Sequence, residues 1–166
     1  MADQFNVLVI CGSLRKGSYN AALTRALPGL APPGMKFVTA PAFETLPLYN
    51  GDMQEVSGFP GPAQDLAAAV RAADGVLFVT PEYNWSMPGG LKNAIDWVSR
   101  MKEQPFEGKP VAIQSCSQGP LGGALCGFGF QKPHGRCVAL DLDLVHLGLG
   151  LERAGPLRLG DLEDSV

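Results

Sequence analysis

Short apolar segments alternate with amphipathic segments along most of the chain. Residues 5–11, FNVLVIC, form a short β-branched apolar run that ends at Gly12, which predicts a strand buried on both faces. Residues 36–40 predict a second strand and residues 76–80 a third, while the stretch from Lys109, KPVAIQSCSQGPLGG, predicts a fourth that ends in a glycine-rich loop.

The segments between these strands carry helical patterns. Ser18 is a suitable cap for a helix through about Leu27, an alanine-rich helix is expected over residues 63–73, and MPGGLKNAIDWVSRM predicts a third helix from near Gly90. Residues 41–62, rich in proline and turn residues, are expected to form a long connection. This alternation predicts an α/β domain with a doubly wound parallel sheet and right-handed crossovers.

Three informative loops follow three of these strands, at residues 12–20, 81–90 and 115–123. In an open parallel sheet, ligands bind beyond the carboxyl ends of the strands. The topology therefore brings the three loops to one edge of the sheet, and their coincidence indicates a binding site more strongly than any one of them.

The first loop, GSLRKGSYN, has the makings of an anion cradle. Ser13, Ser18 and Asn20 offer hydrogen-bond donors, Arg15 offers a bidentate cation, and the start of the following helix favours a negative charge. The Gly-Lys-Ser/Thr ending of a nucleotide-triphosphate loop and the GxGxxG pattern are both absent from it, which leaves a terminal phosphate monoester. The competing interpretation is a solvated turn with a capping serine.

The second loop, PEYNWSMPGG, places Tyr83 and Trp85 among small residues. Such aromatic side chains suit a flat ring, and Glu82 and Asn84 can bond the ring's polar edge. The third loop, SCSQGPLGG, has glycines that let backbone N–H groups approach a ligand closely, as the edge of a flavin would require. The competing interpretation of the second loop is an ordinary surface loop, and the third loop taken alone is a weak signal.

The composition and net charge argue against nucleic acid and membranes as partners. The 166 residues are 46% hydrophobic and 17% charged, with a formal net charge of −3, which is typical of a globular domain and gives no electrostatic reason to expect nucleic acid or an acidic membrane as partner. No apolar run is long enough to span a membrane and no basic leader precedes the first strand, so we expect a cytoplasmic protein.

The four cysteines contain no CxxC pair. A zinc site built from two cysteines and two histidines is the alternative, but their spacings do not fit a finger or ribbon, so reduced thiols and no metal are expected. The residues considered for that site are Cys126, His134, Cys137 and His146.

Four motifs in the same order resemble the NADPH-dependent FMN reductase family of flavodoxin-like proteins, which includes quinone, chromate and azo-dye reductases. The motifs are GSLRKGSYN, LPLYNGD, PEYNWSMPGGLKNAIDW and GKPVAIQSCSQGPLGG, within residues 5–124. The resemblance implies a five-stranded parallel sheet of order 2-1-3-4-5, bound FMN, and NADPH or NADH as hydride donor. It also implies homodimers or homotetramers and small-molecule acceptors such as quinones, chromate, azo dyes, ferric complexes or free flavin.

The same resemblance assigns roles to residues of this chain. It implies that the first loop holds the FMN phosphate, that the second lines the ring and ribityl chain, and that the third borders the ring's pyrimidine end; no side chain is expected to act as a catalytic acid or base. Arg100 is a candidate contact for an NADPH phosphate or anionic acceptor, although a solvated helix end is the favoured interpretation. The expected cofactor-binding residues are Ser13, Leu14, Arg15, Ser18, Asn20, Pro81, Glu82, Tyr83, Asn84 and Ser117.

The resemblance stops near Ala124. Residues 138–152 alternate like a strand, but the tail over residues 125–166 lacks the amphipathic helix that normally covers such a sheet. We expect one flavodoxin-like domain over residues 1–166 with an atypical end, for which a reading-frame change and a divergent folded ending are the two hypotheses. Two alternative functions remain: an electron carrier that docks a protein partner, and a flavin-free chain impaired by its ending.

Overall fold

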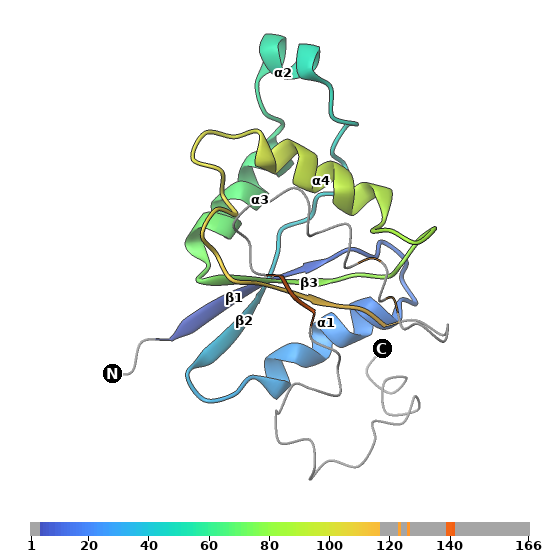
Figure 1. Ribbon diagram of the computed structural model, residues 1–166, viewed down its shortest axis with the longest axis vertical. Coiled ribbons are helices and arrows are strands. Elements are labelled where there is room, and N and C mark those ends of the chain that lie inside the picture. The colour runs from blue at the N-terminus through green and yellow to red at the C-terminus, as the bar shows by residue number, and fades with distance from the viewer. Residues whose placement is uncertain (1–3, 117–122, 124–125, 127–138, 142–166) are drawn as a thin grey trace.

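In the computed structural model, the described residues are 4–116, 123, 126 and 139–141. They form a parallel sheet with helices on both faces (Figure 1). The elements in chain order are β1 (Phe5–Cys11), α1 (Tyr19–Leu30), β2 (Met35–Thr39), α2 (Gly51–Ser57), α3 (Gly61–Ala72), β3 (Gly75–Val79), α4 (Gly89–Ser99), β4 (Val111–Gln114) and β5 (Ala139–Asp141).

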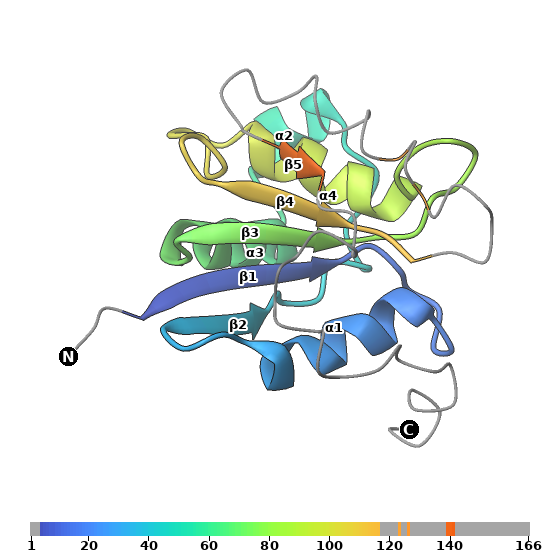
Figure 2. The same cartoon turned by 60° about the horizontal axis from the view of Figure 1, so that its bottom comes forward.

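The five strands lie in the order β2-β1-β3-β4-β5, and every neighbouring pair is parallel. Figure 2 shows this succession, with α1 on one face and α3 and α4 on the other. The expected α/β class and strand order are confirmed. Since the order reverses between β1 and β3, the carboxyl ends of these two strands form the switch point at which such sheets bind ligands.

The main core lies between the sheet and the helices α3 and α4. The apolar side chains of each buried strand alternate between the two faces, so that Leu8 and Ile10 join this core whereas Val9 packs on the α1 side. Trp97, Phe78 and Phe106 are the largest fully buried side chains. The hydrophobic core on the α1 face is smaller. Its buried residues are Val9, Leu27 and Val79, with partly buried neighbours.

Most elements begin and end near their predicted positions. Ser18 caps α1 as expected, with its side chain accepting a hydrogen bond from the backbone N–H of Ala21 at 3.3 Å, although the helix continues through Pro28 to Leu30. Of the alternating stretch over residues 138–152, β5 is the described part, and it adds to the sheet beside β4.

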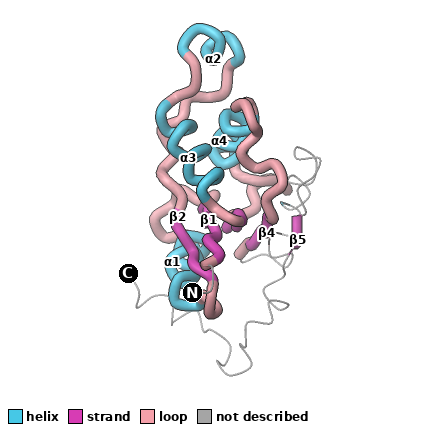
Figure 3. The backbone as a smooth tube through the Cα atoms, turned by 90° about the vertical axis from the view of Figure 1, so that its left-hand side faces the viewer, coloured by secondary structure: helices cyan, strands magenta, loops and turns pink. Residues whose placement is uncertain are grey.

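The helix α2 lies inside the stretch that was expected to be an irregular connection. Its sequence signals are local: Asn50 caps its start by accepting from the backbone N–H of Asp52, and Gly58 ends it by donating to the carbonyl of Gln54. No residue of α2 is buried, so the hydrophobic pattern that reveals other helices is missing. Figure 3 shows α2 standing away from the sheet beyond α3 and α4.

Three hydrogen bonds fix the connection before α2 to the body of the protein. The carbonyl of Pro47 accepts from Trp97 Nε1 at 2.8 Å and from Asn93 Nδ2 at 2.9 Å, while Asn93 Oδ1 accepts from the backbone N–H of Tyr49 at 2.8 Å. The rings of Tyr49 and Trp97 meet edge to face with centroids 5.0 Å apart. Residues 47–57, which we call the α2 arm, are therefore anchored on α4.

Candidate functional site

The loops that follow β1 and β3, and residues 115–116 directly after β4, lie at the carboxyl edge of the sheet, where the sequence predicts a site (Figure 2). They are joined to one another. Asn20 beside the first loop is hydrogen bonded to Cys116 in the third, and Leu14 approaches the start of α4, which follows the second. Glu82 in the second loop accepts from the backbone N–H of Cys126 at 3.2 Å.

The first loop presents polar groups that have no partner among the described residues. This holds for the hydroxyl of Ser13, the exposed guanidinium of Arg15 and the exposed ammonium of Lys16. Ser18 is 5% exposed and its hydroxyl caps α1. Two unpaired cations beside a helix start form an arrangement that attracts an anion.

Gly12 lets the first loop pass close to its neighbours. Its backbone N–H donates to the carbonyl of Val79 at 2.8 Å, and an added Cβ would collide with Thr80 Oγ1 and lie 2.8 Å from Leu91 Cδ2. Thr80 is completely buried. Only a residue without a side chain fits where β1 crosses from the sheet to the loop.

Asn20 has its carboxamide engaged within the protein. Its Oδ1 accepts from the backbone N–H of Cys116 at 3.0 Å, and its Nδ2 donates to the carbonyl of the same residue at 2.9 Å. The side chain is nearly inaccessible, since Asn20 is 2% exposed. The structure therefore places the expected phosphate ligand between the first and third loops.

The second loop makes a tight turn whose tip is exposed. The backbone groups of Tyr83 and Ser86 bond to each other in both directions, at 2.9 and 3.1 Å, and Asn84 and Trp85 have φ angles of 50° and 64°. Two consecutive left-handed residues define a type I′ turn. Asn tolerates this conformation, but Trp adopts it at a cost, and such strain concentrates at functional sites.

The aromatic side chains of this turn are accessible at the candidate site. Tyr83 is 50% exposed and Trp85 is 79% exposed, while Leu14 across the edge is 59% exposed. Pro81 and Glu82 are half-buried. Sequence reasoning identified the aromatic side chains but not the turn, because an Asn-Trp pair is not the Asn-Gly signal of a type I′ turn.

The end of β4 and the first residue after it contribute buried oxygen atoms. The side-chain oxygens Gln114 Oε1 and Ser115 Oγ are buried and have no hydrogen-bond partner among the described residues. Gly123, at φ +89°, passes so close to Ser115 that an added Cβ would collide with its Oγ. Ser117 lies outside the described residues. Unpaired buried acceptors are rare, and they mark places where a further donor fits.

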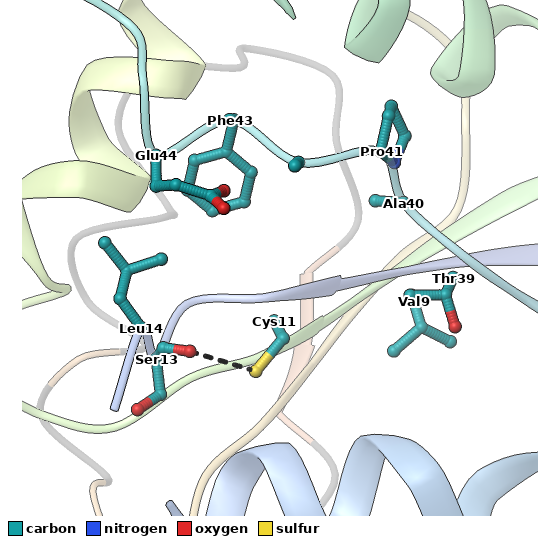
Figure 4. Close-up of a pocket in the computed structure, with 10 residues that line it drawn as sticks. Val9, Cys11, Ser13, Leu14, Thr39, Ala40, Pro41, Phe43 and Glu44 are labelled. Carbon is teal, nitrogen blue, oxygen red and sulfur yellow. Dashed lines mark hydrogen bonds between the residues drawn. The ribbon is translucent and has the colours of Figure 1, made fainter. Parts of the chain in front are cut away.

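A pocket of about 320 Å³ opens beside the first loop on the β2 side. In Figure 4 its wall is formed by Ser13 and Leu14 after β1 and by Phe43 and Glu44 after β2, with Cys11 next to Ser13. The thiol of Cys11 donates to the carbonyl of Ser13 at 3.7 Å. Sequence analysis did not identify this pocket, because the stretch that closes it carries no motif.

Arg100 does not lie near the three loops. Helix α4 begins at the carboxyl edge and runs back across the sheet, so its last turn lies at the opposite edge (Figure 1). There the guanidinium stacks over the ring of Tyr49, 5.4 Å from its centroid.

Two further observations concern membranes and metals. Within the part of the chain that the structure describes, no helix has the length and apolar character to cross a bilayer. Of the four residues considered as zinc ligands, Cys126 is described, and it is 1% exposed within the main core.

Comparison with known proteins agrees with this architecture. The profile of the family described as NADPH-dependent FMN reductase matches residues 5–128. A quinone reductase of Escherichia coli is 51% identical over 132 residues, which cover 80% of this chain and 70% of that protein. An NAD(P)H-dependent FMN reductase of Pseudomonas aeruginosa is 52% identical over 75% of this chain and 66% of its own length.

Among solved structures, a flavoenzyme NAD(P)H:(acceptor) oxidoreductase of Paracoccus denitrificans has a similar fold. Its TM-score is 0.68 at 34% identity, over 83% of this chain and 76% of that one. The sheet order and the ligand edge define a flavodoxin-like α/β protein. Because the family profile and the Escherichia coli relative both match most of the sequence, the chain belongs to the NADPH-dependent FMN reductase family.

Proposed function

We propose that this protein is an FMN-dependent oxidoreductase that takes reducing equivalents from NAD(P)H and delivers them to quinones or similar small acceptors. The observation that carries the proposal is the meeting of the loops after β1 and β3 with the end of β4 at the carboxyl edge, where Ser13 and Arg15 have no side-chain partner among the described residues and lie beside the start of α1. The family and the named quinone reductases among its relatives support the same chemistry.

The chemistry of the edge fits FMN at both of its ends. A terminal phosphate requires hydroxyl donors and a cation, which Ser13, Ser18 and Arg15 supply, with Leu14 beside them. A flat ring with carbonyl and N–H groups requires an apolar wall and polar edge groups. We assign that part to the loop after β3 and to Ser117, the loop residues being Pro81, Glu82, Tyr83 and Asn84.

The residues of the chain bind and orient rather than react. When bound, FMN supplies a ring that accepts a hydride from NAD(P)H and returns the electrons to an oxidised acceptor. Arg15 neutralises phosphate charge, and the exposed rings of Tyr83 and Trp85 provide a surface on which a flat acceptor can lie. Such a mechanism requires no side-chain acid or base.

We also propose that the active form is a homodimer or homotetramer. The α2 arm supports this, since Leu48 and Val56 are 82% and 87% exposed although both are large and apolar. Light scattering of the protein and of a Leu48→Ser, Val56→Ser double variant tests the idea. A smaller particle for the variant is expected, whereas a monomeric parent protein would refute the proposal.

The visible absorption spectrum tests the main proposal. The purified protein is mixed with FMN, desalted and treated with NADPH or NADH, and then with a quinone. Retained flavin bands that bleach with the nucleotide and return with the quinone are expected. A folded sample that retains no flavin would contradict the proposal, and bleaching that requires a separate reductase protein would favour the electron carrier instead.

A further inference from the structure

The Asn20 side chain forms two hydrogen bonds to the backbone of Cys116, which follows β4, and we call this pair of bonds the clamp. The carboxamide accepts from the N–H of Cys116 at 3.0 Å and donates to the carbonyl of Cys116 at 2.9 Å, across a sequence separation of 96 residues. Both bonds fix the plane of the amide, so its orientation is set by the protein rather than by a ligand. With 2% exposure, the side chain is shielded from water, which makes these bonds costly to break.

The clamp joins two parts of the candidate site. On one side, Asn20 belongs to the first turn of α1, directly after the Ser18 cap, and its own carbonyl accepts from Thr24 Oγ1 at 2.9 Å. On the other side, Cys116 follows Gln114 and Ser115, whose buried side-chain oxygens have no partner among the described residues. The phosphate end and the β4 end of the edge are thereby connected by one side chain.

A residue that bound phosphate directly would direct its amide N–H toward the loop over Ser13 and Arg15. Here one Nδ2–H bond is already directed to Cys116, and Oδ1, which would repel a phosphate, is held by an N–H group. Asn is suited to these two bonds, because its carboxamide offers a donor and an acceptor side by side.

We propose that Asn20 is a positioning residue that holds the loop after β4 against the phosphate loop, rather than a ligand of the phosphate itself. The proposal rests on the proposed function for its consequence in flavin binding, but the clamp exists in the flavin-free protein. Loss of the clamp separates the two loops. It therefore weakens contacts to the whole flavin, whereas loss of a phosphate ligand weakens contacts to the phosphate alone.

Amide hydrogen exchange of the flavin-free protein, followed by NMR, tests the clamp itself. In the Asn20→Ala variant the Cys116 amide should exchange at least about tenfold faster than in the parent. Asn20→Asp keeps an acceptor for that N–H and should retain most of the protection. Thr24→Val, which removes the hydroxyl bond to the Asn20 carbonyl, is the matched control and should leave the Cys116 amide unchanged.

Paired affinities for FMN and riboflavin test the consequence, because riboflavin lacks the phosphate. Asn20→Ala should weaken both by a similar factor, roughly tenfold to a hundredfold. Arg15→Ala, the comparison variant, should weaken FMN and leave riboflavin nearly unchanged. The reduction potential of bound FMN should shift in Asn20→Ala but not in Arg15→Ala, because only the former moves the loop after β4.

The outcomes separate the two proposals. A Cys116 amide that is unprotected in the parent, or equally protected in Asn20→Ala, would overturn the clamp whatever the flavin result. Loss of FMN affinity with intact riboflavin affinity in Asn20→Ala would also overturn it, because Asn20 would then be a phosphate ligand. A parent protein that binds neither flavin would refute the proposed function, while the exchange experiment would still decide the clamp. If Asn20→Ala does not fold, the nearly isosteric Asn20→Leu variant, which also lacks both hydrogen bonds, provides both measurements.

Discussion

Two regions of the protein differ in what they bury: the face of the sheet that α3 and α4 cover, which we call the helical side, and the carboxyl edge of the sheet. Between the sheet and α3 and α4, apolar side chains such as Phe78 and Phe106 fill the space, and Trp97 of α4 is completely buried against the residues around the α2 arm. At the carboxyl edge polar side chains such as Asn20 and Thr80 are buried, Gly12 makes a close approach, and Trp85 has left-handed backbone geometry. A closely packed scaffold thus supports loops whose polar groups and exposed rings remain available to a ligand.

The difference suggests that stability and flavin binding respond to different substitutions. Changes on the helical side should lower the free energy of unfolding and leave the flavin affinity of the folded protein intact. Changes at the edge should mainly lower flavin affinity, and they should alter stability only at Gly12, where the two regions meet, and at Trp85, where the backbone is strained.

Trp97→Ala should give the largest effect. It removes a completely buried ring and the hydrogen bond from Nε1 to the carbonyl of Pro47, so the free energy of unfolding should fall by about 3–5 kcal/mol. Urea unfolding measures this loss, with Trp97→Phe as the smaller control. A loss below about 1 kcal/mol would mean that the helical side does not dominate stability.

Gly12→Ala should affect both regions at once. The added Cβ would collide with Thr80 Oγ1 and lie 2.8 Å from Leu91 Cδ2, so we expect a destabilisation of about 1–3 kcal/mol together with weaker FMN binding. Gly29→Ala makes the same chemical change at an exposed position of α1, where nothing outside the helix backbone and the neighbouring residues lies within 4 Å of the new Cβ, and it should neither destabilise the protein nor weaken FMN binding. Equal behaviour of the two variants in unfolding and FMN titration would refute the close approach.

Trp85→Gly should change stability in the opposite direction. The ring is 79% exposed and the residue has φ 64°, so glycine relieves backbone strain at little cost in packing. Trp85→Ala removes the ring but keeps the strain. The glycine variant should therefore be more stable than the alanine variant by about 1 kcal/mol in thermal and urea unfolding. An alanine variant that is the more stable would show that the turn is not strained.

Lys92→Ala should have the smallest effect. Lys92 and Asp96 form an ion pair across one turn of α4, with a distance of 2.7 Å from Nζ to Oδ2, but both side chains are accessible. The loss should be below about 0.5 kcal/mol and should disappear in high salt. A larger or salt-independent loss in urea unfolding would contradict this estimate.

Much of the scaffold was predictable because it is local and periodic. The run over residues 5–11 and the stripe through Leu91, Ile95 and Val98 define their elements by the positions of their apolar residues. The helix α2 escaped the same reasoning because it has no buried face, although its capping residue Asn50 was visible in the sequence.

The general position of the site was also predictable, since parallel strands bring the loops after them to one edge. Its internal contacts were not. The bonds from Asn20 to Cys116 and from Cys126 to Glu82 join residues far apart in the chain and leave no periodic signal. The roles of individual residues in holding FMN stay predictions.

Hydrogen exchange with and without FMN tests most directly the central claim that the carboxyl edge binds the flavin while the helical side supports it. Residues 12–18, 81–88 and 115–116 should gain protection when FMN is added, and the interior of α3 and α4 should exchange slowly in both states. Protection confined to residues 39–44, at the pocket beside β2, or no protection at the edge at all, would contradict the account.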